Sequence, residues 1–106
     1  MAGKDRRREI LAEIEALGPV LPGSIFERTT RCQRSGCHCH SDPPTLHGPY
    51  PTWVRQEGRR QVTRTLTDEE AKRARPLISA DRRLKELVRE LEALGVADFE
   101  RERRRF

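Results

Sequence analysis

The chain gathers its metal-binding residue types in one short stretch. Its only cysteines, Cys32, Cys37 and Cys39, fall within eight positions, and all three histidines lie in or just after that stretch. An odd number of cysteines argues against a framework made of disulfides alone. In a reducing compartment, clustered thiols more often bind a metal ion. The cluster therefore predicts a metal site.

The spacing Cys-x4-Cys-x-Cys-x7-His predicts a single zinc ion with Cys32, Cys37, Cys39 and His47 as its ligands. Three thiolates and one imidazole are a common tetrahedral ligand set for structural zinc. Gly36 allows the loop to bend back and present the second cysteine. The site would carry a formal charge of −1, because three thiolates outweigh one dication.

Alternatives to this site remain open. His38 and His40 are rival fourth ligands, although their closeness to the cysteines adds little constraint on the chain. The thiols might also hold an iron–sulfur cluster, whose usual spacings are missing, or no metal at all. If His47 were not a ligand, zinc would keep a position for water, with Glu57 or Asp42 as the candidate base of an enzyme.

Length and composition fit a small domain that needs a structural metal. The chain has 106 residues, of which 37% are charged and only 34% hydrophobic, so its core must be thin. Structural zinc would add on the order of 10 kcal/mol of folding free energy. The sequence has no nucleophile elbow, glycine-rich phosphate loop or helical His-Glu-x-x-His. We therefore predict one non-catalytic domain over residues 1–106.

The elements that must position the site form an α+β fold in this reading. Apolar residues recur at helical spacing near the N-terminus and again toward the C-terminus, and between them lie β-branched residues around Gly58, a plausible hairpin turn. The expected elements are a helix over 4–17, a linker and metal loop over 18–49, a β-hairpin over 50–66, a helix over 67–95, and a basic tail over 96–106.

The second helix has recognisable boundaries. Thr67 and Glu70 have the spacing of a capping box, and Gly95 is the expected stop. Pro76 is expected to kink the helix. Leucines at seven-residue intervals form a seam over 77–94, which we expect to pair with the first helix, either within one chain or across a homodimer. The facing stripes are Ile10, Ile14 and Leu17 against Leu84, Leu87 and Leu91.

The net charge of +5 and the pI of about 9.7 favour an anionic partner, with nucleic acid first. Residues 32–66 supply +3 of this charge. The predicted nucleic-acid contacts are the hairpin arginines Arg55, Arg59, Arg60 and Arg64.

Two aromatic residues accompany these arginines. Trp53 and Tyr50 are the only tryptophan and the only tyrosine, and both lie on or next to the first hairpin strand. Their rings are candidates for stacking on unpaired bases. In a chain with so few aromatic residues, they are equally candidates for the core, packed against Leu84 or Leu87.

The order of motifs resembles a family of short prokaryotic proteins known only as a domain of unknown function. The resemblance rests on Leu-Pro-Gly-Ser at 21–24, the cysteine triplet, and His-Gly-Pro-Tyr at 47–50, and it covers about residues 19–94. It implies a small metal-binding domain with a hairpin and a long helix, and no established activity. An association of some members with mobile elements is an indication of work on DNA.

The sequence therefore predicts a small zinc-stabilised, zinc-finger-like protein that binds nucleic acid, DNA rather than RNA, in a regulatory or accessory role on mobile DNA. The alternative is a zinc-stabilised adaptor for protein interaction or dimerisation, with no nucleic-acid binding. No apolar run approaches the ~20 residues of a membrane span, and no secretory leader is visible, so we expect a cytoplasmic protein.

Overall fold

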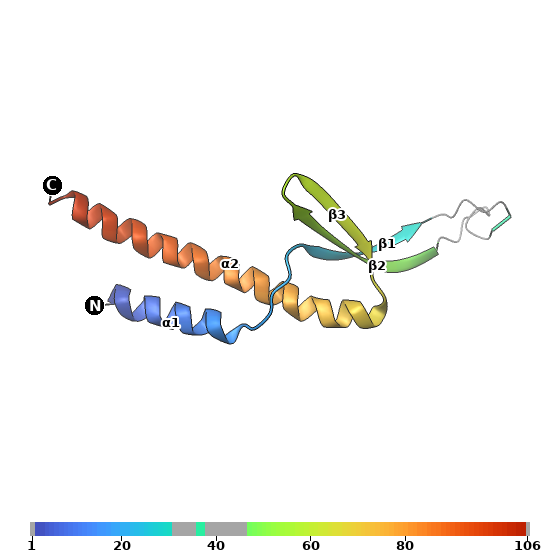
Figure 1. Ribbon diagram of the computed structural model, residues 1–106, viewed down its shortest axis with the longest axis horizontal. Helices are drawn as coiled ribbons and strands as arrows, with labels where there is room; N and C mark the ends of the chain where they lie inside the picture. Colours follow the sequence, from blue (N-terminus) through green and yellow to red (C-terminus); the bar gives the residue numbers. More distant parts are fainter. Residues whose placement is uncertain (1, 31–35, 38–46, 106) are drawn as a thin grey trace. The chain divides into compact units, whose positions relative to one another are not determined.

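The computed structural model describes residues 2–30, 36–37 and 47–105 (Figure 1). The predicted α+β class is confirmed, as an N-terminal helix, a three-stranded antiparallel sheet and a long C-terminal helix. None of the described helices combines the length and the apolar character that crossing a membrane requires. The elements are α1 (Ala2–Ala16), β1 (Ser24–Thr30), β2 (His47–Glu57), β3 (Arg60–Thr65) and α2 (Asp68–Arg103).

The chain divides into two compact units. The first, here called the sheet unit, is Pro22–Pro76 and holds the three strands and the first turns of α2. The second, here called the helix unit, joins Met1–Leu21 to Leu77–Phe106 and holds α1 and the remainder of α2.

In the helix unit, α1 and α2 lie side by side and antiparallel (Figure 1). Arg6 Nη2 lies 2.7 Å from Glu90 Oε2, and Arg83 pairs with Glu13. Increasing residue numbers in α1 therefore meet decreasing numbers in α2, as expected for an antiparallel pair.

The apolar stripes predicted from helical spacing form the interior of the helix unit. Ile10 and Leu87 have no exposed surface, and Ile14, Leu84 and Leu91 are half-buried. Of the two arrangements that the sequence left open, the structure shows the pairing within one chain.

The start of α2 is fixed by the predicted capping box. The amide of Thr67 donates to Glu70 Oε1 at 2.9 Å, and the amide of Glu70 donates to Thr67 Oγ1 at 3.1 Å. These bonds satisfy two donors that the helix itself leaves unpaired. The backbone and side-chain bonds from Thr67 also lower the pKa of the Glu70 carboxyl. Pro76 lies inside the helix, which continues past it.

The end of α2 differs from the prediction. The helix runs through Gly95 to Arg103, so most of the expected basic tail is helical. Gly95 does not adopt the positive φ that ends many helices. Beyond it, acidic and basic residues three positions apart form ion pairs that support further turns: Asp98 with Arg101, and Glu100 with Arg103.

The sheet has the order β1-β2-β3. Strands β2 and β3 form the predicted hairpin, in which Glu57 lies opposite Arg60 and Gly58 takes a φ of 64° at the first turn position. The hairpin begins at His47, earlier than predicted, and β1 occupies part of the segment expected to be a linker. Most residues of β1 are exposed, so its sequence lacks the alternation that marks a half-buried strand.

Candidate metal centre and basic sheet

Two of the four predicted zinc ligands meet in the structure. Cys37 Sγ lies 3.3 Å from His47 Nε2, and both residues are half-buried. In a tetrahedral site with ordinary Zn–S and Zn–N bonds, the sulfur and nitrogen atoms lie about 3.5 Å apart. The separation therefore fits either a direct hydrogen bond or a shared ion. Gly36 precedes the cysteine with a φ of 79°, as the expected bend in the loop requires.

The other two predicted ligands, Cys32 and Cys39, lie outside the described residues, and so do the rival ligands His38 and His40. Within residues 2–30, 36–37 and 47–105 there is no cluster of three or more possible metal ligands. The described part of the chain thus contributes one thiol and one imidazole to the candidate centre.

A β-bulge at the start of β2 positions His47. Arg28 lies opposite Tyr50, while Thr30 lies opposite His47, so two steps along β1 match three along β2. Gly48 has a φ of 105°, and a Cβ atom there would lie 2.7 Å from the carbonyl oxygen of Arg28. Bulges of this kind redirect side chains next to functional sites. The glycine of the His-Gly-Pro-Tyr sequence is therefore required by the backbone.

The sheet has two faces, which the register defines. What we call the Trp53 face carries Ile25, Trp53, Arg55, Glu57, Arg60, Val62 and Arg64; the Tyr50 face carries Phe26, Arg28, Tyr50, Thr52, Val54, Thr63 and Thr65. Because the bulge adds one residue to β2, the alternation assigns His47 to the Tyr50 face.

Arg55 is engaged within the protein. Its guanidinium lies 4.3 Å from the centre of the Trp53 ring, and its Nε donates to Glu57 Oε1 at 2.9 Å. Only 17% of its side chain is exposed, and its buried Nη1 has no hydrogen-bond partner among the described residues. This residue was one of the predicted nucleic-acid contacts, and the structure leaves little of it accessible to a phosphate.

Trp53 is half-buried and anchors the segment before β1. Its Nε1 donates to the carbonyl oxygen of Pro22 at 2.8 Å. Next to Pro22, Gly23 has a φ of 97°, and a Cβ atom there would collide with the carbonyl oxygen of Val54. Trp53 thus has a packing role inside the sheet unit, closer to the expectation of a core residue than to that of a stacking one.

The other three predicted arginines are accessible. Arg59, Arg60 and Arg64 are exposed, and none forms an ion pair within the described chain. Arg28 on β1 shares both properties and was missed by the sequence reading, which placed it in a linker. A strand assignment for 24–30 would have added it to the candidates.

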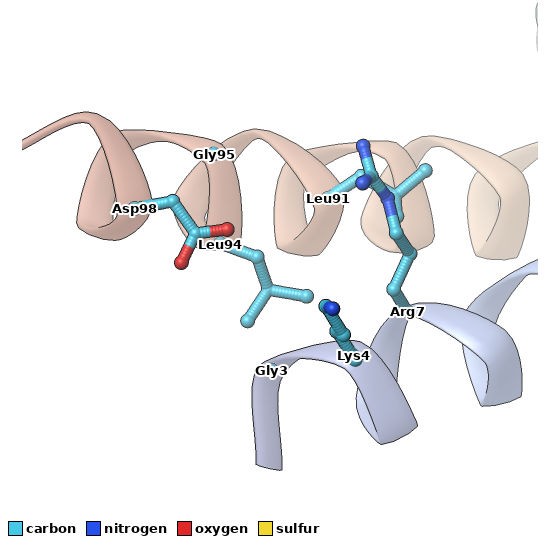
Figure 2. A pocket seen from close by; sticks show the side chains of 7 residues that line it. All are labelled: Gly3, Lys4, Arg7, Leu91, Leu94, Gly95 and Asp98. Atoms are coloured by element: carbon cyan, nitrogen blue, oxygen red, sulfur yellow. The ribbon is translucent and has the colours of Figure 1, made fainter. Parts of the chain in front are cut away.

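A hollow between the helices of the helix unit does not add a second site. It is lined by Gly3, Lys4, Arg7, Leu91, Leu94, Gly95 and Asp98 (Figure 2). Two of these residues are glycines, one on each helix, and no atom lies within 4 Å of the position of a Cβ atom on either. The hollow is therefore a gap that missing side chains leave between the helices.

Comparison with known proteins gives a family and no characterised relative. No match was found among curated proteins or among solved structures. One family model matches residues 4–76, which include α1, the three strands and the candidate metal centre. The chain therefore belongs to the family described as Domain of unknown function (DUF6788).

Proposed function

We propose that the protein is a small zinc-stabilised nucleic-acid-binding protein of the cytoplasm, with DNA favoured over RNA and a regulatory or accessory role on mobile DNA. The zinc has a structural role in this proposal, and the protein is not an enzyme. Cys32, Cys37, Cys39 and His47 would hold one ion per chain. The contact between Cys37 and His47 at 3.3 Å supports this ligand set.

The observation that carries the proposal is the pattern of ion pairs on the sheet. Both carboxylates of the described strands are paired, Glu57 with Arg55 and Glu27 with Arg75. The charged side chains that remain unpaired there, and in the hairpin turn, are all arginines: Arg28, Arg59, Arg60 and Arg64. An exposed surface with one sign of unpaired charge attracts phosphates. We therefore assign the contacts to these four residues and give Arg55 a supporting role.

The test compares two triple variants. Arg59, Arg60 and Arg64 are replaced by Gln in one. In the matched control Arg82, Arg89 and Arg104 of the described α2 are replaced, since these are also exposed and form no ion pair there. Binding to duplex and single-stranded oligonucleotides is measured over a range of salt. Each lost phosphate contact should flatten log affinity against log salt by about 0.7–0.9, so the first variant should lose roughly two to three units of slope.

The control variant should bind like the parent. Equal losses in the two variants would show that only the net charge matters, and an unchanged slope in the first would remove these residues from the contact surface. Metal content must be equal in all three proteins, so that any loss of binding is assigned to the arginines.

The second candidate is a protein-interaction adaptor that recruits a partner or a second copy through α2. The observation in its favour is the exposure of Val96 and Phe99, at 62% and 60%, on the last turns of the helix. Isolated exposed apolar residues are common on proteins, so this observation is the weaker of the two. Absence of nucleic-acid binding by the metal-loaded parent would leave the adaptor as the better reading.

A further inference from the structure

The Tyr50 face of the sheet is an exposed aromatic surface. Phe26 on β1 and Tyr50 on β2 are 51% and 42% exposed, although large aromatic side chains usually dominate a core. Neither ring was a product of the arginine pattern used above. Their exposure in a chain with only 5% aromatic residues requires an explanation.

The register places the two rings next to each other. Phe26 lies opposite Thr52 and Tyr50 lies opposite Arg28, so the two aromatic residues are diagonal neighbours on adjacent strands. Diagonal neighbours lie about 7–8 Å apart, within reach of aromatic side chains. Thr52, the residue opposite Phe26, is only 1% exposed.

The rest of the face is polar and positively charged. Arg28 is exposed beside Tyr50 and forms no ion pair within the described chain. Thr63 and Thr65 on β3 are exposed on the same face and supply hydroxyl groups. The described residues of this face include no carboxylate. Its charge therefore complements a phosphate backbone, and its two rings offer surfaces for bases.

We infer that the Tyr50 face binds single-stranded nucleic acid, with unpaired bases stacked on Phe26 and Tyr50 and the backbone held by Arg28. This inference rests on the proposed function and specifies its ligand as a strand with unpaired bases. Aromatic side chains on neighbouring strands of an open antiparallel sheet stack with two or three bases in common RNA-binding modules. Paired bases in a duplex do not offer their faces for such stacking.

The experiment uses the metal-loaded full chain and four fluorescent ligands of equal length, about 15 nucleotides each. They are oligothymidine, oligouridine, an abasic strand with the same phosphates, and a duplex. The two homopolymers distinguish DNA from RNA, and the abasic strand removes the bases while it keeps the charge. Oligothymidine or oligouridine should bind at least about tenfold more tightly than the abasic strand.

Three variants locate the stacking. Phe26→Ala and Tyr50→Ala should each weaken binding to the homopolymers by about tenfold and leave abasic binding unchanged. Phe99→Ala is the matched control, since this phenylalanine is 60% exposed on α2, and it should bind like the parent. Tyr50→Phe keeps the ring and should also bind like the parent, which separates loss of stacking from loss of fold.

The possible failures are distinct. Salt-dependent binding that is equal for abasic and base-containing strands would overturn the stacking and leave the proposed function intact. Preference for the duplex over both homopolymers would do the same. No binding to any of the four ligands would overturn both proposals. Photo-crosslinking of a bromouracil-containing strand provides an independent readout, and crosslinks confined to α1 and α2 would place the strand elsewhere.

Discussion

Arg83 on α2 holds the carboxylate of Glu13 on α1 with two nitrogen atoms, Nε and Nη2. The Nη2 atom lies 2.9 Å from Glu13 Oε1, and Nη1 of the same guanidinium reaches Glu86 at 3.0 Å. A two-point contact fixes the orientation of the pair as well as its distance. Within the helix unit, this contact lies on one side of the buried Ile10 and Arg6–Glu90 lies on the other.

Replacing Glu13 by Gln should make the protein less stable at neutral pH and no less stable in acid. The hydrogen bonds from Arg83 lower the pKa of the Glu13 carboxyl, which burial opposes only in part. A carboxyl with a lowered folded pKa stabilises the fold above its unfolded pKa of about 4.3, and this contribution is lost as pH falls through the folded pKa. Urea unfolding of parent and variant at pH 7 and pH 3 measures the difference.

Glu15→Gln is the control for this prediction. Glu15 is exposed on the same helix and forms no ion pair within the described chain. Its replacement should change stability little at either pH. A loss for Glu13→Gln that persists unchanged at pH 3 would show that the carboxylate charge is not what Arg83 recognises.

The purified protein should contain one zinc ion per chain, and His47→Ala should weaken zinc binding far more than His38→Ala or His40→Ala. His47 is the imidazole that reaches Cys37, at 3.3 Å. Structural zinc contributes on the order of 10 kcal/mol to folding, so a chelator should unfold the sheet unit. Elemental analysis and competition with a chromophoric chelator give the stoichiometry and affinity. Equal losses for all three histidine variants, or iron in place of zinc, would contradict this ligand set.

Thr67→Ala should reduce the free energy of unfolding by about 1 kcal/mol, because it leaves the amide of Glu70 without its partner. Thr67→Ser keeps a hydroxyl at the cap and should recover most of the loss. Denaturant titration of both variants measures the effect. If alanine and serine behaved alike, the hydroxyl would not be the group that stabilises the helix start.

Gly95→Ala should stabilise the protein by about 1 kcal/mol, because Gly95 lies inside α2 and a Cβ atom there meets no other atom within 4 Å. Gly23→Ala should do the opposite and cost more than about 1 kcal/mol, since φ is 97° and the Cβ atom would collide with β2. Thermal unfolding of the two variants gives the sign. A destabilising Gly95→Ala would argue for the helix end predicted from sequence.

Leu87→Ala should cost about 2–5 kcal/mol, whereas Val88→Ala should cost less than about 1 kcal/mol. Leu87 is completely buried, while its neighbour is 41% exposed. The homodimer predicted through residues 77–94 would have to form around a seam that α1 of the same chain already covers at Leu87. Light scattering of the parent at micromolar concentration tests it, and a monomer mass would reject the dimer.

The sequence revealed those parts of the fold that depend on local chemistry. The Thr67 and Glu70 pair and the positive φ of Gly58 follow from residues a few positions apart, and both were predicted. The strand β1 was not assigned, because it is fixed by pairing across the chain, as between Ile25 and Trp53, and has little burial pattern of its own.

The candidate site was predictable to a similar extent. The spacing of Cys37 and His47 was sufficient to predict that they meet, since both are metal-ligand types in one loop. The arginines could not be sorted by sequence, because the local composition around Arg55 and Arg64 is alike. Only the register shows that the first lies over Trp53 beside Glu57 while the second remains exposed.

The hydrogen bond from Trp53 to Pro22 has a spectroscopic consequence. Trp53 and Tyr50 are the only tryptophan and tyrosine of the chain, and both belong to the sheet unit. Intrinsic fluorescence therefore reports on that unit alone, and breaking the bond to the carbonyl of Pro22 exposes the indole to water and shifts its emission to longer wavelength. Helical circular dichroism arises from α1 and α2, most of whose residues belong to the helix unit. One cuvette thus gives two independent signals, and their midpoints along a single denaturant titration compare the stability of the two units without labels or truncation.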